Sequence, residues 1–296
     1  MADVVSFGEA MLELSGLEPE RCRLSIAGDT FNTAVYLARA GISVAYATAI
    51  GACPFSQRLT QALQAEGIAT DLVARVPDRA LGVYAIELDE DGERSFTYWR
   101  SESAVRALFS SAKAETVRSA LLETKLLYLS GITLSLYTED VRDELLRVLE
   151  KRKTEGLCTV FDPNYRPRNW SSAAVAQAAM ERATSLATWS LPTFDDEAAL
   201  FGDASPEATA DRHRALGADE VIVKHGAKGA FIAETGWVAP QTVVTPTDTT
   251  GAGDSFNAAY IAAQLTGADK TTSVRFGHQL AAKVLSVSGA LLPRNS

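Results

Sequence analysis

The alternation of short apolar runs with longer helical patterns is the feature that most constrains how this chain can fold. β-Branched and aromatic residues are concentrated in the short runs, at 4–8, 43–51, 125–131, 157–164, 185–191 and 220–226. Between them lie segments with helical character, among them 30–41, 138–156 and 255–267, several of which end in glycine. Strands that alternate with helices are typical of a parallel sheet covered by helices. We therefore expect an α/β fold.

One region breaks this alternation. Residues 79–104 predict two strands rich in aromatic and β-branched residues, joined by a turn at Asp91-Gly92. Together with residues 12–27, this hairpin predicts a small sheet that acts as a lid, formed by approximately 12–27 and 72–104. Neither an internal repeat nor a Pro/Ser-rich linker divides the 296 residues, so we expect a single domain, 1–296, with the lid as an insertion.

The charge balance limits the partners of the chain. Its 28 Lys and Arg residues against 37 Asp and Glu residues give a net charge of -9, which opposes binding to nucleic acid or to an anionic membrane. No apolar run is long enough to cross a bilayer, and the first residues lack the pattern of a signal peptide. Cys22, Cys53 and Cys158 lack the spacing of a zinc site, which predicts reduced, buried thiols. We expect a cytoplasmic protein.

The most informative stretch is DTTGAGDSFNAAYIAA at 248–263, in which small residues lead directly into a helical pattern. Gly251, Ala252 and Gly253 can present backbone N–H groups at a helix N-terminus, which suits the charge that develops on a transferring phosphoryl group. Asp254 stands where a carboxylate could take the proton of an attacking hydroxyl. The alternative is that Asp254 only caps the helix, since aspartate is favoured at that position.

This string resembles the second signature of the ribokinase, or phosphofructokinase-B, superfamily of carbohydrate kinases. The resemblance implies a ribokinase-like three-layer α/β/α domain with a mostly parallel central sheet and a small β-sheet lid. The family's first signature is present in altered form at 27–51. It implies that Gly28, Asp29 and Asn32 contact the sugar. For Asp29, a role as N-cap of the following helix is the alternative.

The same resemblance places a nucleotide beside the strand end and glycine turn at 223–230. It implies that ATP is the phosphoryl donor and that the nucleotide contacts Lys224, Gly226, Gly229 and Thr249.

For metal handling, the resemblance implies an Asn-x-x-Glu element near 191–202. Phe194 stands where the asparagine is expected, whereas Glu197 is retained. We expect Mg²⁺ near Glu197 and Asp248. The resemblance also implies a loop for a monovalent cation such as K⁺, near Asp248, Thr250 and the Ser288-Gly289 turn.

Two arginines suggest that the substrate is an acid. Arg100 ends the hairpin, in GERSFTYWRSESA at 92–104, and Arg166 follows a central strand, in DPNYRPRNW at 162–170. A planar guanidinium holds a carboxylate through paired, charge-assisted hydrogen bonds, which a neutral sugar does not require. Both strings resemble 2-keto-3-deoxygluconate kinases, and this resemblance runs from 8–14 to 288–294. By position, it implies substrate contacts from Gly28, Tyr84, Tyr98, Arg100 and Arg166, with Asp254 as the base.

We therefore expect ATP-dependent phosphorylation of 2-keto-3-deoxygluconate at its 6-hydroxyl. One alternative is a fructokinase or ribokinase that acts on a neutral sugar, and another is a non-catalytic sugar-binding protein of the same fold. For Tyr84 and Tyr98, packing within the lid or at a dimer contact is the alternative to substrate binding. An aromatic-rich lid is also compatible with a homodimer formed through it.

Overall fold

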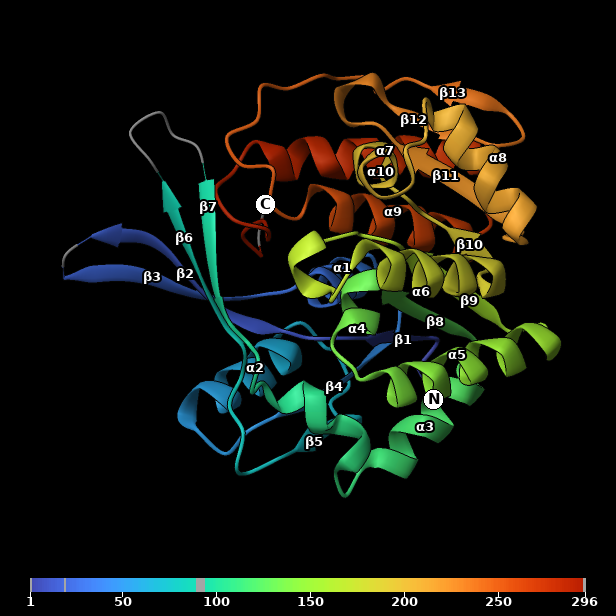
Figure 1. Cartoon of the computed structure of the whole chain (residues 1–296). Coiled ribbons are helices and arrows are strands. Elements are labelled where there is room, and N and C mark those ends of the chain that lie inside the picture. Colours follow the sequence, from blue (N-terminus) through green and yellow to red (C-terminus); the bar gives the residue numbers. More distant parts are fainter. Residues whose placement is uncertain (1, 19, 89–93, 295–296) are drawn as a thin grey trace.

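A computed structural model describes residues 2–18, 20–88 and 94–294. Within these residues, the largest feature is a nine-stranded sheet in the order β13-β12-β11-β10-β9-β8-β1-β4-β5 (Figure 1). Its strands are β1 (Val4–Phe7), β4 (Val44–Ile50), β5 (Val73–Arg75), β8 (Leu126–Ser130), β9 (Cys158–Asp162), β10 (Trp189–Ser190), β11 (Glu220–Lys224), β12 (Ala230–Ile232) and β13 (Gly236–Val238). The strands from β5 to β11 pair in parallel, and β12 and β13 pair antiparallel at one edge. The mostly parallel sheet predicted from the sequence is confirmed.

Helices cover both faces of this sheet, which gives the three layers that were expected. One face packs against α1 (Asp29–Arg39), α2 (Pro54–Ala65), α9 (Ala252–Leu265) and α10 (Lys270–Leu285). The other face packs against α3 (Ala114–Glu123), α4 (Gly131–Ser135), α5 (Glu139–Thr154), α6 (Ala173–Leu186), α7 (Phe194–Phe201) and α8 (Pro206–Leu216). Short 3₁₀ helices are η1 (Ala104–Ser110), η2 (Pro167–Asn169) and η3 (Gly226–Lys228). Because successive side chains of a strand point to opposite faces, Leu126 and Leu127 of β8 lie in different cores.

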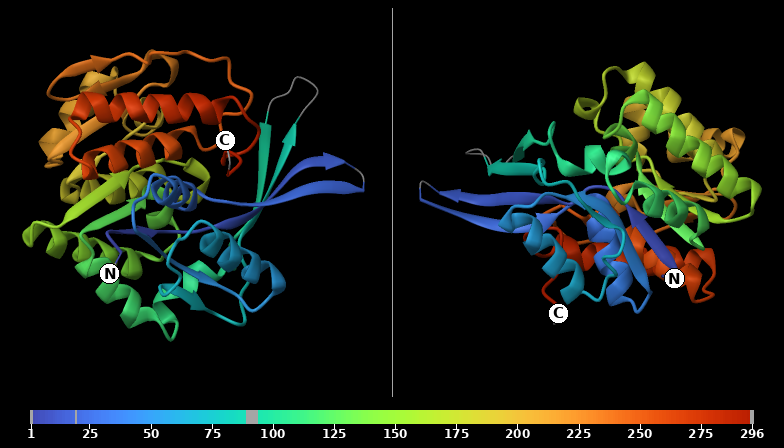
Figure 2. Two further views of the ribbon diagram at one scale, coloured as in Figure 1. Left: turned by 180° about the vertical axis from the view of Figure 1, so that it is seen from behind. Right: turned by 90° about the horizontal axis from the view of Figure 1, so that it is seen from below.

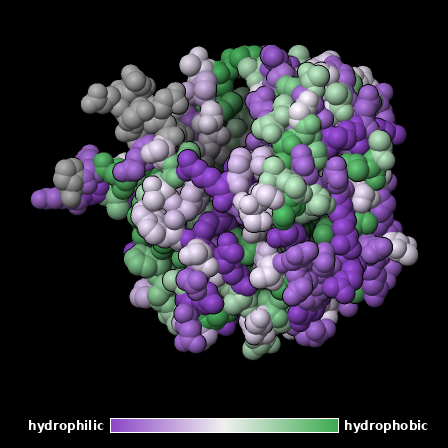
Figure 3. Space-filling model, in the orientation of Figure 1, coloured by the Kyte–Doolittle hydropathy of each residue, from purple (hydrophilic) through white to green (hydrophobic). Residues whose placement is uncertain are grey.

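A second, four-stranded sheet has the order β3-β2-β6-β7 and projects from the body of the molecule (Figures 2 and 3). Its strands are β2 (Met11–Glu18), β3 (Arg21–Ala27), β6 (Val83–Leu88) and β7 (Arg94–Trp99). The small sheet predicted from 12–27 and the hairpin is therefore confirmed. The turn expected at Asp91-Gly92 lies outside the described residues.

The structure corrects some details of the sequence-based prediction. β5, at 73–75, was assigned to the lid, but it pairs with β4 in the large sheet, where Val73 and Ala74 are buried. The strand expected at 185–191 is reduced to the two residues of β10, because 185 and 186 complete the last turn of α6. Cys22 is exposed on β3 rather than buried. None of the described helices is long and apolar enough to span a membrane.

Candidate active site

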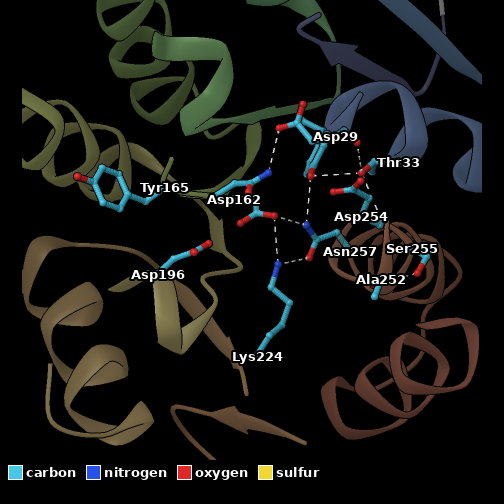
Figure 4. Close-up of polar contacts among 12 residues, drawn as sticks. Asp29, Thr33, Asp162, Tyr165, Asp196, Lys224, Ala252, Asp254, Ser255 and Asn257 are labelled. Carbon is cyan, nitrogen blue, oxygen red and sulfur yellow. Dashed lines mark hydrogen bonds and ion pairs between the residues drawn. The ribbon is translucent and has the colours of Figure 1, made fainter. Parts of the chain in front are cut away.

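Polar side chains gather at the carboxyl ends of the parallel strands, where loops lead into α1 and α9 (Figure 4). Asp162 ends β9 and Lys224 ends β11, while Asp29 and Asp254 lie in the first turns of α1 and α9. These two helices pack against each other although they come from opposite ends of the sequence. Open α/β sheets bind ligands at this edge.

Asp254 faces the site rather than capping its own helix. The N-cap of α9 is Gly251, whose φ of 78° favours glycine, and a Cβ atom there would lie 2.8 Å from the carbonyl oxygen of Ala290. The Asp254 carboxylate accepts a hydrogen bond of 2.8 Å from Nδ2 of Asn32, on α1. The structure therefore brings residues from both predicted signatures into direct contact.

The surroundings of Asp254 make it a stronger base than an ordinary aspartate. Burial raises the pKa of Asp254 to about 7, the nearby Asp29 carboxylate acts in the same direction, and the hydrogen bond from Asn32 opposes the rise. Burial also raises the pKa of Asp29. A carboxylate that titrates near neutral pH is suited to accept a proton from a hydroxyl group.

Asp29, predicted to contact the sugar, lies in the first turn of α1 at the same edge of the sheet. Its carboxylate accepts a hydrogen bond of 3.2 Å from Nδ2 of Asn164. The N-cap of α1 is Gly28, directly before it, so the alternative role of Asp29 as N-cap is not observed.

A buried polar cluster lies beside Asp254, and of its members only Lys224 was predicted from the sequence. Nζ of Lys224 donates to Oδ2 of Asp162 at 3.1 Å and to Oδ1 of Asn257 at 3.0 Å. Nδ2 of Asn257 donates to the same Asp162 oxygen at 2.6 Å (Figure 4). The other carboxylate oxygen of Asp162 is buried without a hydrogen-bond partner in the described part of the chain. A polar residue at a buried strand end, and an asparagine three positions after Asp254 on the same helix, were the available signals.

A cavity of about 330 Å³ opens beside this cluster. It is lined by the residues predicted to contact nucleotide and by part of the predicted anion-binding turn, namely Lys224, Gly226, Gly229, Thr249, Ala252 and Gly253. Much of the remaining wall is apolar and includes Val243, Val244, Phe256 and Leu285. An apolar wall suits a flat aromatic base, and the N-terminus of α9 suits a phosphate group.

The two tyrosines predicted to contact substrate lie on adjacent strands of the small sheet. Tyr84 on β6 pairs with Tyr98 on β7, and their rings stack with centroids 5.6 Å apart. Tyr84 is buried and its hydroxyl donates to the carboxylate of Glu13 on β2, whereas Tyr98 is 44% exposed. Tyr84 therefore packs within the small sheet, and Tyr98 is accessible to a ligand or a partner.

Each arginine predicted to bind an acid already has an acidic partner in the protein. Nη2 of Arg100 lies 2.5 Å from Oε2 of Glu9, and both side chains are buried. Nη1 of Arg166 lies 3.0 Å from both carboxylate oxygens of Asp196, and the Arg166 side chain is 50% exposed. Arg166 therefore keeps part of its guanidinium accessible, while Arg100 is enclosed.

The structure does not place Glu197 as a metal ligand. Its side chain is 1% exposed, and its Oε2 lies 2.6 Å from Nη2 of Arg212 and 3.2 Å from Nε2 of His213. Asp196 faces the site instead, close to Lys224 and Asp162 (Figure 4). Successive helical residues are rotated by about 100°, so a shift of one position moves a side chain from the core to the site.

Asp248 is engaged by backbone groups. Its carboxylate accepts hydrogen bonds from the N–H groups of Thr250 at 2.8 Å and Gly289 at 2.7 Å, which joins the two segments predicted to form a monovalent-cation loop. In the described ranges, no three or more His, Cys, Asp and Glu side chains form a group that could hold a metal ion.

Comparisons with known proteins identify the family of this chain. The model of the pfkB family carbohydrate kinases matches residues 1–295. The 2-dehydro-3-deoxygluconokinases of Escherichia coli K12 and Haemophilus influenzae are 37% and 34% identical, over 99% of this chain and 98% and 96% of theirs. A PfkB protein from Polaromonas sp. JS666 superposes with a TM-score of 0.86 at 28% identity, covering 100% of this chain and 98% of that one. A Vibrio cholerae fructokinase with fructose, ADP and calcium ion bound gives 0.84 at 26%, covering 98% and 94%. This chain belongs to the pfkB family of carbohydrate kinases.

Proposed function

We propose that this protein transfers the γ-phosphoryl group of ATP to the 6-hydroxyl of 2-keto-3-deoxygluconate, giving 2-keto-3-deoxy-6-phosphogluconate. Asp254 carries the proposal, because a carboxylate with a pKa of about 7 lies at the helix N-terminus that lines the cavity of about 330 Å³. The full-length similarity to proteins named 2-dehydro-3-deoxygluconokinase supports the choice of substrate.

In this reaction, the oxygen of the 6-hydroxyl attacks the γ-phosphorus while Asp254 accepts the hydroxyl proton, and ADP leaves. The hydrogen bond from Asn32 fixes the orientation of the carboxylate. Backbone N–H groups of Gly251, Ala252 and Gly253 stabilise the negative charge that develops on the transferred group, because they lie at the positive end of α9. The N-terminus of α9 thus provides both the base that accepts the proton and the N–H groups that stabilise the transferred phosphoryl group.

ATP would place its base against the apolar wall of the cavity and its phosphates beside Lys224 and the start of α9. Bound Mg²⁺ would neutralise the negative charge of the phosphates. Asp162 and Asp196 are the residues that would hold it, because a buried Asp162 oxygen lacks a partner among the described residues and carboxylate oxygens suit this ion. A monovalent cation such as K⁺ would bind at the loop that Asp248 joins to Gly289.

The sugar acid would lie between the small sheet and the first turn of α1. Gly28, Asp29 and Asn32 would contact its hydroxyl groups, and Arg166 and Arg100 would bind its carboxylate. Tyr98 would close over it from the small sheet, supported by the stacked ring of Tyr84, and would exclude water from the γ-phosphate. We also propose that two copies of the chain pair through this sheet.

The first test is an ADP-release assay with 2-keto-3-deoxygluconate, gluconate, 2-ketogluconate, fructose and ribose. We expect 2-keto-3-deoxygluconate to give the highest kcat/KM.

The second test compares this acid with its amide in wild type and in Arg166→Ala. The variant should lose roughly 30- to 1000-fold in kcat/KM for the acid, because the carboxylate loses a charged partner, but little for the amide. Arg168→Ala, which removes an exposed arginine from the same loop, is the control. An unchanged preference in Arg166→Ala would exclude the carboxylate contact.

A kinase for a neutral sugar is the second candidate. The pairing of Arg100 with Glu9 and of Arg166 with Asp196 favours it, because both arginines are neutralised within the protein. A Vibrio alginolyticus fructokinase is also 29% identical over 84% of this chain. In this case, the assay would find fructose or ribose as the best substrate, and Arg166→Ala would leave the preference for the acid over its amide unchanged.

A further inference from the structure

A buried ion pair lies where the small sheet joins the main body. Glu9 lies in the connection between β1 and β2, and Arg100 directly follows β7. Nη2 of Arg100 lies 2.5 Å from Oε2 of Glu9, and the two side chains are 10% and 3% exposed. Charges this deeply buried persist only when they are paired, because each would otherwise lose its hydration without compensation. The ion pair therefore links the segment that leads into β2 with the segment that follows β7.

The backbone at Gly82 packs closely against this ion pair. Gly82 directly precedes β6, and its carbonyl oxygen accepts a hydrogen bond of 2.9 Å from the N–H of Leu12 on β2. A Cβ atom on Gly82 would lie 2.8 Å from Oε1 of Glu9 and 3.2 Å from Cβ of Arg100. Glycine at this position thus permits the close approach of the two charged side chains.

The backbone of Arg100 is fixed to the body, independently of its guanidinium. The Arg100 carbonyl oxygen accepts hydrogen bonds from Nε of Arg106 at 3.1 Å and from the N–H of Ser103 at 3.2 Å. Arg106 in turn donates to the carbonyl oxygen of Leu136 at 2.7 Å. The orientation of the guanidinium then depends on the group that pairs with it, which is Glu9.

The ion pair retains hydrogen-bonding capacity that the rest of the described protein does not satisfy. Among the described residues, neither oxygen of Glu9 and neither Nε nor Nη2 of Arg100 has a hydrogen-bond partner of good geometry. The charge of Arg100 also reaches Asp29, where it opposes the effect of burial on the pKa of that carboxyl group. The guanidinium thus lies within electrostatic reach of Asp29, which is proposed to contact the sugar. Because Nε and Nη2 are enclosed, Arg100 would act on a ligand carboxylate mainly through its charge.

We propose that Glu9 is a positioning residue, which holds the guanidinium of Arg100 at the base of the small sheet. Through this contact, Glu9 fixes the position of the small sheet. It also fixes the orientation of the Arg100 guanidinium, which is proposed to bind the substrate carboxylate. Glu9 touches no reacting atom and acts through Arg100. The substrate part of this inference rests on the proposed function, whereas the structural coupling does not.

A double-mutant cycle tests the substrate part. Glu9→Gln keeps the shape and removes the charge, and it should lower kcat/KM for 2-keto-3-deoxygluconate by about 100-fold, mainly through KM, because a displaced guanidinium no longer fits the carboxylate. Arg100→Ala should cost little more in the Glu9→Gln background than Glu9→Gln alone. Glu102→Gln removes an exposed acid close to Arg100 in sequence and should leave activity unchanged. Losses that multiply in the double variant would show that Glu9 acts independently of Arg100, which overturns this part.

Amide hydrogen exchange of the ligand-free protein tests the structural part. Glu9→Gln should speed the exchange of β6 and β7 relative to wild type and to Glu102→Gln. Gly82→Ala should do the same while keeping both charges, because its methyl group pushes the pair apart. If Glu9→Gln does not fold, Gly82→Ala and Glu9→Asp provide the measurement. Unchanged exchange in the folded variants would overturn the coupling.

The two proposals fail in different ways. If the wild-type protein phosphorylates no sugar acid, the proposed function is excluded. Faster amide exchange of β6 and β7 in Glu9→Gln would still support the structural coupling between Glu9 and the small sheet. A wild-type protein active on the acid, combined with unchanged exchange and multiplying losses, would overturn the role of Glu9 and leave the proposed function in place.

Discussion

At the residue scale, Asp254 is the side chain whose removal should affect the chemistry most. Asp254→Asn cannot accept a proton but can still accept the hydrogen bond from Asn32. We expect kcat to fall by roughly 10²- to 10⁴-fold in an ADP-release assay. The melting temperature at pH 8 should not fall, because the substitution removes a buried negative charge. Near-normal turnover in this variant would exclude Asp254 as the base.

The pH dependence of the reaction follows from the same residue. Burial raises the pKa of Asp254 from 3.8 to about 7, so the base is largely protonated below that pH. We expect kcat/KM to rise through about pH 7 and to level above it, since the deprotonated form reacts. The folded state holds this proton more tightly than the unfolded chain, so the stability that it contributes is present at low pH and is lost as pH rises through about 7.

Two pH series check this expectation. The first is the pH profile of kcat/KM in wild type, and a profile that is flat between about pH 5.5 and about pH 8.5 would contradict the assignment. The second measures the free energy of unfolding, in which Asp254→Asn should become more stable relative to wild type as the pH rises to about 7, with little change above that pH.

Residues of the site differ in how well the sequence could locate them. Asp254 and Asn32 lie in local motifs, and their direct contact joins the two predicted signatures. Asp162 and Asn257 meet across 95 positions of sequence, so their contact depends on how the sheet orders its strands. The metal assignment to Glu197 is not supported, because this side chain pairs with Arg212 in the interior while Asp196 faces the site. First-turn acids look alike in sequence, and packing sets their rotation about the helix axis.

At the element scale, a buried arginine attaches α5 to the sheet. Arg152 is 0% exposed, and burial lowers its pKa to about 10. Its guanidinium donates to the carbonyl oxygens of Leu121, Leu122, Thr124 and Cys158 and to the hydroxyl of Thr159. These acceptors lie at the end of α3, in the connection to β8, and at the start of β9. One side chain therefore binds backbone carbonyl groups from three successive segments of the chain.

Replacing this arginine should reduce stability without affecting the chemistry. Arg152→Met leaves several buried carbonyl groups without a donor, and we expect the free energy of unfolding to fall by about 2–4 kcal/mol in urea titrations. Arg152→Lys should lose less, and Arg147→Met, which changes an exposed arginine of the same helix, should lose almost nothing. Equal stability of Arg152→Met and Arg147→Met would show that the five hydrogen bonds contribute no net stability.

The sequence also predicts some elements better than others. β1, β4, β8, β9 and β11 appear as continuous apolar runs, because strands covered on both faces need no polar alternation. The three-residue strands β5, β12 and β13 were missed. Strands this short are determined by pairing with a neighbour rather than by their own composition.

At the scale of the whole molecule, the position of the site follows from the topology. A parallel sheet brings the carboxyl ends of its strands to one edge, and the contact between α1 and α9 joins the first and last parts of the chain there. The sequence could therefore predict where the site lies. It could not predict how the small sheet is attached, because the contact between Glu9 and Arg100 depends on strands that leave the body and return to it.

The small sheet also exposes apolar side chains, which leads to a prediction for the assembly. Leu17 on β2 and Trp99 on β7 are 43% and 57% exposed. Exposed apolar side chains on a projecting sheet are a common basis of symmetric dimers. We expect light scattering after size-exclusion chromatography to give a mass close to twice the 31.6 kDa of one chain. The double substitution Leu17→Ser, Trp99→Ser should weaken association by roughly 10- to 100-fold, because a large aromatic contact is lost.

Trp237→Ser provides the matched control, since this tryptophan is 45% exposed but lies on β13, at the edge strand of the large sheet. It should leave the mass unchanged over a dilution series. A wild-type protein that is monomeric at every concentration would exclude pairing through the small sheet. If Trp237→Ser caused dissociation and the double substitution did not, the interface would lie at the edge of the large sheet, where β13 carries this tryptophan.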